Sequence, residues 1–267
     1  MTTLAVVPAR LGATRLPRKP LRLLGGAPLV VRVWERVCAM RVADRVVIAT
    51  DSPEVADAVR GTGAECVLTS DRHPSGTDRV AEVAARAEYA AFRTVVNVQG
   101  DEPFVSAEAV LGAAALVRDG RFPLGTAAAR AGADVLARPD VVKVVTADDG
   151  RAMYFSRAAI PHLREARDAA DARARDGLVR QHIGVYAYSR EALAEWVRLP
   201  THPLERVERL EQLRPLAAGI AMGVATIDEA PQCGIDTEDD LLRANARWGD
   251  GRDGLTRTEF HAADQRG

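Results

Sequence analysis

The sequence has 267 residues, enough to bury a full hydrophobic core in one α/β domain. Hydrophobic residues make up 47% and charged residues 27%, which is typical of a folded globular protein and excludes an intrinsically disordered chain. The net charge of −1 gives no support for nucleic-acid binding, and no apolar run is long enough to cross a bilayer. The N-terminus shows no export signal, so we predict a cytoplasmic protein with neither nucleic acid nor membrane as a partner.

The first half of the chain alternates short apolar runs with helical patterns. The runs predict buried parallel strands at Leu4–Val7, Arg45–Ala49, Glu65–Leu68 and Thr94–Val98. The segments between them have helical spacing and predict helices at Pro28–Met40, Pro53–Gly61 and Thr77–Tyr89. This rhythm predicts an α/β fold with a mostly parallel central sheet and helices on both faces. In such sheets ligands bind at the carboxyl ends of the strands.

The second half of the chain is mixed. Val141–Thr146 and Arg151–Phe155 predict a hairpin closed by an Asp-Asp-Gly turn, and the highly charged Leu163–Arg175 predicts a solvated helix or mobile excursion. Further elements are predicted as a strand at Gln181–Tyr188, a helix at Pro203–Ala218, a strand at Ile220–Thr226 and a helix at Thr237–Trp248. We predict one domain over residues 1–248, with an inserted mixed β subregion at about 140–190 and a disordered tail at 249–267.

A basic loop follows the first predicted strand and spans Pro8 to Leu21. Its prolines and glycine exclude a helix, and its cations are Arg10, Arg15, Arg18 and Lys19. Placed at the ligand-binding edge of the sheet, such cations and exposed backbone N–H groups predict binding of phosphate oxygens. The segment is neither a P-loop nor a dinucleotide glycine fingerprint, which disfavours a nicotinamide oxidoreductase.

Lysine is rare in this chain. Of the 36 basic residues only Lys19 and Lys143 are lysines. Arginine's planar guanidinium cannot replace a compact ammonium, so each lysine is a candidate for a role that needs a point charge. Compositional drift is the alternative explanation for either one.

Two acidic motifs predict a metal site. Asp101 follows the strand Thr94–Val98 in a Gly-Asp-Glu-Pro turn, and Asp236 precedes the last predicted helix. Mg²⁺ prefers hard oxygen ligands, commonly one or two carboxylates completed by phosphate oxygens. Asp101 and Asp236 can hold such a metal from opposite sides of a cleft. Thr237 with Asp240 also forms a capping box, so helix initiation alone can explain the threonine.

A turn at Ser75–Arg79 precedes another predicted helix. Exposed N–H groups at a helix start suit an anion or a nucleotide base, although Ser75 also fits a simple N-cap. A scattered polar set in the second half can bind a polyhydroxylated acid, with arginine for the carboxylate and acceptors for the hydroxyls. Its members are Arg157, His182, Tyr186, Glu208, Glu211 and Gln212, with the last three predicted on one helix face. Each of them can also be an ordinary structural polar residue.

Eight segments of the chain together carry a family resemblance. They are PARLGATRLPRKPL, ATD, SGTDR, VNVQGDEP, YFSRAAIP, QHIGVYAY, PLERVERLEQLR and GIDTEDDL, spread between residue 4 and about residue 246. The chain resembles the cytidylyltransferases that make the CMP ester of 3-deoxy-manno-octulosonic acid (Kdo), an acidic sugar of lipopolysaccharide. Arg18 stands where many members have glycine, and the stretch at 163–175 and the tail beyond Trp248 have no matching motif.

The resemblance implies a Rossmann-like nucleotidyltransferase fold, a homodimer that uses the inserted subregion, CTP and Kdo as substrates and Mg²⁺ as the metal. By matching position it assigns Pro8, Arg10, Arg15, Lys19, Ser75 and Gly76 to the nucleotide, and Asp101 and Asp236 to the metal. It assigns the sugar acid to Gln99, Arg79, Arg157, His182, Tyr186, Glu208, Glu211 and Gln212. Arg10, Lys19 and Asp101 are the predicted catalytic residues.

Two alternatives stay open at this stage. One is a cytidylyltransferase for another ulosonic acid, such as an amino-substituted Kdo or a sialic-acid relative. The other is an inactive nucleotide-sensing homologue, which is disfavoured because both Asp101 and Lys19 are present.

Overall fold

A central sheet organises the chain. The computed structural model describes residues 2–12, 15–165, 167–231 and 234–249. The main path of the sheet has the order β11-β7-β10-β6-β1-β4-β5. Its strands are β1 Thr3–Ala9, β4 Arg45–Thr50, β5 Glu65–Leu68, β6 Thr94–Val98, β7 Leu124–Arg130, β10 Arg180–Ser189 and β11 Met222–Ile227. Along this path only β10 is antiparallel to its neighbours, so the mostly parallel sheet is confirmed.

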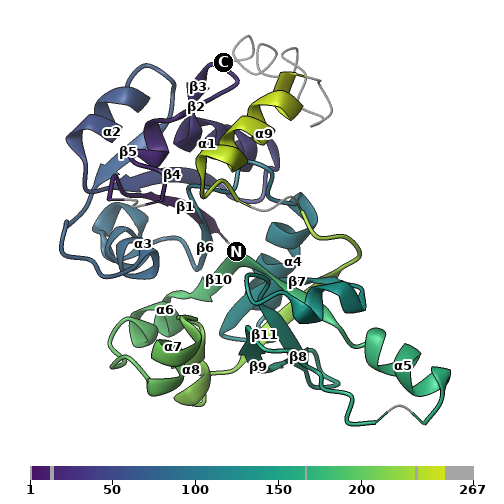
Figure 1. The fold of residues 1–267 in the computed structure, drawn as a ribbon. Coiled ribbons are helices and arrows are strands. Elements are labelled where there is room, and N and C mark those ends of the chain that lie inside the picture. Colours follow the sequence, from purple (N-terminus) through teal and green to yellow (C-terminus); the bar gives the residue numbers. More distant parts are fainter. Residues whose placement is uncertain (1, 13–14, 166, 232–233, 250–267) are drawn as a thin grey trace.

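Helices cover both faces of this sheet because the strands alternate apolar side chains between two cores (Figure 1). Ala5 and Val7 of β1 face α1 Leu29–Ala39, α2 Pro53–Val59 and α4 Ala107–Arg118. Leu4 and Val6 face the other core, which contains residues of α3 Gly76–Ala85, α6 Arg190–Trp196 and α8 Leu213–Ala217. The predicted fold class is therefore confirmed.

The inserted hairpin extends one side of the sheet. It consists of β8 Lys143–Thr146 and β9 Ala152–Ser156, which pair antiparallel, while β8 also pairs with β10. Its turn ends at Gly150, whose φ of +85° favours glycine. Beyond the hairpin, α5 Ala169–Asp176 has no buried residue and projects from the body (Figure 1). The hairpin and the solvated helix were both predicted.

The last helix, α9 Glu238–Gly249, lies beside the short strands β2 Leu23–Leu24 and β3 Ala27–Pro28 (Figure 1). Asn245 fastens it to this hairpin, accepting from the backbone N–H of Gly25 at 2.9 Å and donating to the carbonyl of Leu23 at 3.0 Å. Beneath it a small apolar cluster joins the basic loop to the segment that carries Asp236; its members include Leu16, Leu24, Phe104, Ile235 and Leu241. The basic loop and the β2–β3 hairpin are thereby packed against α9.

The predicted helix at Pro203–Ala218 is wrong. The chain forms two short helices there, α7 Pro203–Glu208 and α8, because Arg209 adopts a left-handed φ of 56°. The N–H of Leu210 then returns to the carbonyl of Glu205 at 3.2 Å, and Leu210 is buried. The remaining elements are the 3₁₀ turns η1 Lys19–Leu21, η2 Ala87–Tyr89 and η3 Ala133–Ala137.

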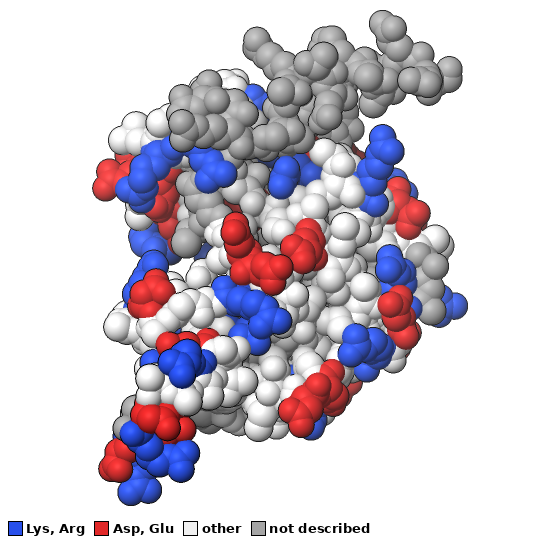
Figure 2. All heavy atoms as spheres, turned by 90° about the vertical axis from the view of Figure 1, so that its right-hand side faces the viewer, with Lys and Arg blue, Asp and Glu red and all other residues white. Residues whose placement is uncertain are grey.

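The charge distribution on the surface and the lengths of the helices relate to the predicted partners and location. On the face shown in Figure 2, basic and acidic side chains are interspersed. In the described part of the chain no helix is long and apolar enough to span a membrane. The predicted tail lies outside the described residues apart from Gly249, and the cytoplasmic location stays a prediction.

Candidate active site

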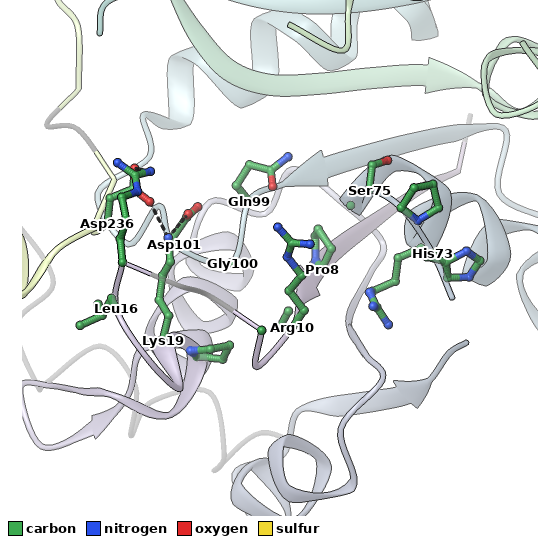
Figure 3. Close-up of a pocket in the computed structure, with 17 residues that line it drawn as sticks. Pro8, Arg10, Leu16, Lys19, His73, Ser75, Gln99, Gly100, Asp101 and Asp236 are labelled. Atoms are coloured by element: carbon green, nitrogen blue, oxygen red, sulfur yellow. Dashed lines mark hydrogen bonds and ion pairs between the residues drawn. The ribbon is translucent and has the colours of Figure 1, made fainter. Parts of the chain in front are cut away.

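A pocket of about 500 Å³ opens at the carboxyl ends of β1 and β6 and the start of α3 (Figure 3). This is the sheet edge where ligands bind in open α/β folds. Predicted site residues that line it are Pro8, Arg10, Arg15, Lys19, Ser75, Gly76, Arg79, Gln99, Asp101 and Asp236. The structure thus brings the predicted nucleotide and metal residues together in one cavity.

Backbone contacts hold the two acidic motifs in register. Gly100 lies so close to β1 that a Cβ atom there would be 2.5 Å from the carbonyl oxygen of Pro8, so only glycine fits. The N–H of Ile235 donates to the carbonyl of Asp101 at 2.9 Å, which places the neighbouring Asp236 beside Asp101. Asp240 caps this segment by accepting from the N–H groups of Asp236 and Thr237 at 3.1 and 2.8 Å, as the capping box predicts.

Lys19 lies between the two aspartates. Its Nζ donates to Oδ2 of Asp101 at 2.5 Å and to Oδ1 of Asp236 at 2.8 Å, as Figure 3 shows. Arg15 pairs with the other oxygen of Asp236 at 2.8 Å. Both carboxylates therefore reach one cation from opposite sides. Among the described residues no cluster of three or more His, Cys, Asp or Glu side chains is arranged to hold a metal.

The charges in this cluster are strongly coupled. Burial disfavours the charged form of Lys19, but the attraction and hydrogen bonds of Asp101 and Asp236 outweigh it and raise its pKa. Glu102 is partly buried beside the same aspartates, and burial together with their charges raises its pKa to about 8. Glu102 also accepts a hydrogen bond from the backbone of Gly234, so it orients the turn.

Two arginines of the basic loop behave differently. Arg10 is exposed at the pocket and forms no ion pair with any residue that the structure describes, so its guanidinium is available to a ligand. Arg18 points away from the pocket and pairs with Glu54 of α2. The departure from glycine at position 18 therefore adds an anchor between the loop and α2.

The turn before α3 combines an N-cap with a link to the second half of the chain. Ser75 Oγ accepts from the N–H of Asp78, as the N-cap interpretation predicts. Glu211 lies 2.9 Å from Ser75 Oγ and accepts from Thr77 Oγ1 at 3.2 Å. Burial raises the pKa of Glu211, although these hydrogen bonds oppose the shift. Glu211 thus joins the predicted acceptor region to the predicted nucleotide turn.

Arg79, which was predicted to bind the sugar acid, is held in place by neighbouring residues. It is buried, and its guanidinium is held by Asp51 at 2.8 Å and by Thr69 and the Ser70 carbonyl. Arg79 lines the pocket, but both of its terminal guanidinium nitrogens already donate hydrogen bonds within the protein. It braces the turn that carries Ser75.

Arg157 and Glu208 form a second group beyond the pocket. The carboxylate of Glu208 accepts from Ser156 Oγ at 2.6 Å and from the N–H of Arg157 at 2.9 Å. The Arg157 guanidinium donates to the carbonyls of Glu208 and Pro139 at 2.9 and 3.1 Å. The two residues therefore hold each other on the turn that follows β9.

His182 and Tyr186 share one face of β10, as their spacing predicts. Their ring centroids are 5.6 Å apart, and Phe155 packs edge-on against His182 at 5.0 Å. Thr126 gives its single hydroxyl proton to the carbonyl of Val185 at 2.7 Å, so it accepts from Nε2–H of His182 at 3.0 Å. Nδ1 of this histidine is then an acceptor.

The prediction that Glu208, Glu211 and Gln212 share one helix face is wrong. The break at Arg209 directs Glu208 to the β9 turn and Glu211 to the Ser75 turn. Gln212 is buried, and its Nε2 has no partner among the described residues. Six predicted acceptor residues lie outside the lining of the pocket: Arg157, His182, Tyr186, Glu208, Glu211 and Gln212.

One pocket residue escaped the sequence interpretation. His73 lines the cavity, and its Nε2 lies 2.6 Å from Oε2 of Glu82 in α3. Its position two residues before Ser75, in the loop that enters a predicted helix at the ligand edge, was the available signal. Leu16, Pro20 and Gly100 also line the pocket.

Comparison with known proteins identifies the family. The model of the cytidylyltransferase family matches residues 4–224. A 3-deoxy-manno-octulosonate cytidylyltransferase of Gemmatimonas aurantiaca is 63% identical over 93% of this chain and 95% of its own length. The protein of that name from Polynucleobacter necessarius is 44% identical over 90% and 93%. The chain belongs to the cytidylyltransferase family.

Solved structures agree with this assignment. A CMP:2-keto-3-deoxy-manno-octonic acid synthetase complexed with CTP superposes with a TM-score of 0.84 and 35% identity, over 94% of this chain and 99% of that one. A 4-diphosphocytidyl-2C-methyl-D-erythritol synthase from Anaerococcus prevotii, at 15% identity, has a TM-score of 0.60 and covers 93% and 98%. The second likeness shows only that the two proteins share a fold.

His182 predicts a pH-dependent stability for this cytidylyltransferase. Burial lowers its pKa from 6.5 to about 3. Between these values the unfolded chain binds one more proton than the folded chain, so the stabilisation present above pH 6.5 is lost as the pH falls toward 3. We expect the wild type to lose about 2 kcal/mol through this residue between pH 7 and pH 5.

Urea unfolding of the wild type and His182→Gln at pH 7 and pH 5 measures this loss. The free energy of unfolding of the wild type minus that of His182→Gln should be about 2 kcal/mol smaller at pH 5 than at pH 7. His162, which is exposed, provides the matched control His162→Gln, for which no such narrowing is expected. A difference for His182→Gln that is the same at both pH values would contradict the assignment of His182 as neutral with a lowered pKa.

Proposed function

We propose that this chain transfers CMP from CTP to the anomeric hydroxyl of Kdo, giving CMP-Kdo and pyrophosphate for lipopolysaccharide biosynthesis. The main support is the pocket in which Lys19, Asp101 and Asp236 converge with Arg10 at the ligand edge of the sheet. Relatives at 63% and 44% identity over nearly the whole chain carry the name of this activity. A structural relative is a complex with CTP.

The reaction is an in-line displacement at the α-phosphorus. The anomeric oxygen of Kdo forms the new P–O bond, the bond from the α-phosphorus to the bridging oxygen of the β-phosphate breaks, and the hydroxyl proton passes to solvent. Arg10 and Lys19 reach into the cavity with donors that can neutralise the charge developing on pyrophosphate. Positioning and electrostatic stabilisation supply most of the catalysis in such transfers.

The two aspartates fit the Mg²⁺ that the resemblance implies. They bracket the Lys19 ammonium at 2.5 and 2.8 Å, which shows that both carboxylates can reach a single cation. When bound there, Mg²⁺ would supply Lewis-acid stabilisation of the triphosphate. Lys19 would then exchange its carboxylate partners for phosphate oxygens, to which its compact ammonium is equally suited.

The acceptor acid is proposed to bind next to the cavity, between Gln99 and the β10 face. His182 stays neutral because burial lowers its pKa to about 3, so Nδ1 can accept a hydrogen bond from a sugar hydroxyl. Nε2 of Gln212 is a buried donor with no partner in the described part of the chain, and a ligand oxygen would satisfy it. To bind the carboxylate of the sugar acid, the Arg157 guanidinium would need to break a hydrogen bond to a backbone carbonyl. Another ulosonic acid is the alternative substrate.

We also propose a homodimer that uses the inserted subregion. Met153 of β9 and Leu204 and Val207 of α7 are exposed apolar residues, and the first two line a groove between the hairpin and the α7–α8 segment. Contiguous exposed apolar surface is typical of an interaction site. Sedimentation velocity should show a species of twice the chain mass; a monomer at micromolar concentration would contradict this part of the proposal.

A substrate panel tests the proposed function. Pyrophosphate release is measured with CTP, ATP, GTP or UTP, each with Kdo, an amino-substituted Kdo, a sialic acid or no acid, and with or without Mg²⁺. Release that requires CTP, Kdo and Mg²⁺ together is expected. If another acid is preferred, that acid and not Kdo is the substrate. If no pair of nucleoside triphosphate and acid releases pyrophosphate, the proposed transferase activity is excluded.

A further inference from the structure

Lys143, the second of the two lysines, is completely enclosed. It is the first residue of β8, its side chain has 0% exposure, and it forms no ion pair with the described residues. Burial lowers its pKa, and the nearby Asp140 only partly opposes this effect. A buried ammonium without an anion is costly unless its donors are all used.

All three N–H donors of this ammonium are used. Nζ donates to the carbonyls of Arg138 at 2.9 Å, Val141 at 2.7 Å and Arg157 at 2.6 Å. These carbonyls belong to two segments that are separate in sequence, the loop before β8 and the turn after β9. A tetrahedral ammonium directs three N–H groups from one atom to these three carbonyls, whereas arginine spreads its five N–H groups over a larger plane. Because lysine is rare in this chain, its presence at position 143 supports a role for the compact ammonium.

The turn held by Lys143 is the one that carries Arg157. Glu208 holds the same turn from the other side, through Ser156 Oγ at 2.6 Å and the N–H of Arg157 at 2.9 Å. The Arg157 guanidinium then returns to Pro139, in the loop that Lys143 fastens, at 3.1 Å. Lys143 and Glu208 together fix both the backbone and the side chain of Arg157.

We infer that Lys143 is a positioning residue for the acceptor acid, acting through the Arg157 turn. This inference rests on the proposed function, in which Arg157 contributes to binding of the acid. Without the ammonium, the Arg157 carbonyl and the 138–141 loop lose their shared donor and the turn loses one of its two supports. The nucleotide pocket is lined by other residues, so we expect it to keep its geometry in the variants.

Lys143→Met and Lys143→Gln test the inference, because methionine removes all three donors and glutamine keeps two. We expect the KM for Kdo to rise in the order wild type, Lys143→Gln, Lys143→Met, with at least a tenfold rise for methionine. The Kd for CTP, measured by calorimetry without Kdo, should stay within twofold. Arg157→Ala should raise the KM for Kdo as well, and adding Lys143→Met to it should change that KM by less than twofold.

Arg190 is a control for the loss of a partly buried cation that donates to backbone carbonyls. It donates to the carbonyls of Ala84, Tyr89 and Phe92, far from the Arg157 turn in the sequence and on the α3 side. Arg190→Met should lower the free energy of unfolding without raising the KM for Kdo. The glutamine variant covers the case in which Lys143→Met fails to fold.

The inference is overturned if folded Lys143 variants keep the wild-type KM for Kdo, if the Kd for CTP rises in parallel, or if Arg190→Met raises the KM for Kdo equally. Additive effects of Lys143→Met and Arg157→Ala would also overturn it. Wild-type turnover of Kdo is measured first. If the wild type does not turn over Kdo, the proposed function is wrong. If it does, and the Lys143 variants keep the wild-type KM for Kdo, only the role of Lys143 is wrong.

Discussion

Replacing Lys19 with alanine is expected to leave a folded protein whose turnover with CTP and Kdo is lower by roughly a hundredfold to a thousandfold. Removing one preorganised charge contact to a transition state typically raises the barrier by about 2.7–4 kcal/mol. Lys19 lines the pocket with only 13% side-chain exposure, and it contacts both predicted metal ligands. Steady-state pyrophosphate release at saturating CTP and Kdo measures the loss.

Arg18→Ala is the matched control for Lys19→Ala. Arg18 precedes Lys19 in the same loop, but it pairs with Glu54 and does not line the pocket. Its loss should change turnover by less than about twofold, since an exposed ion pair contributes about 1 kcal/mol or less to stability and nothing to the cavity. Circular dichroism and thermal unfolding confirm that both variants fold. Wild-type turnover in Lys19→Ala, or an equal loss in Arg18→Ala, would contradict the assigned role.

Replacing Asp101 with asparagine is expected to abolish nearly all turnover and to weaken Mg²⁺ binding in the presence of CTP. The substitution keeps the shape of the side chain but removes one of the two carboxylates that bracket a cation. Mg²⁺ prefers charged oxygen ligands, and this site offers only two from the described residues. Calorimetric titration of Mg²⁺ into the CTP complex, alongside pyrophosphate release, separates metal binding from chemistry.

Asp119→Asn is the corresponding control. Asp119 is an exposed acid at the end of α4, outside the pocket, and its ion pair is with its neighbour Arg118. Its substitution should leave Mg²⁺ binding and turnover within about twofold, as expected for a surface ion pair. An Asp101→Asn protein that binds Mg²⁺ as tightly as the wild type would show that Asp101 is not a ligand.

The nucleotide side of the site was predictable from sequence because it depends on local patterns. Lys19 and Asp101 each follow a buried strand, and parallel strands bring such segments to one edge without further information. The capping box at Thr237 also follows from local spacing. That Lys19 would sit between Asp101 and Asp236 was not predictable, because the contact joins segments separated by more than two hundred residues.

The acceptor side was predicted less well, for physical reasons. The left-handed Arg209 breaks the helix that spacing indicated, and no glycine or proline at that position signals it. The strand β7 at Leu124–Arg130 was missed because its alanines and glycine lack the β-branched residues typical of strands. Its burial between β10 and β11 stabilises it instead. The role of Lys143 required its three carbonyl partners to be seen together.

The most direct measurement of the central claim is ³¹P NMR of CTP incubated with the purified protein, Mg²⁺ and Kdo. The account predicts that the α-phosphorus signal of CTP is replaced by one phosphodiester signal, with one pyrophosphate released for each ester formed, and that neither appears without Kdo. Formation of CMP whether or not Kdo is present, or a CTP spectrum that does not change, would contradict it.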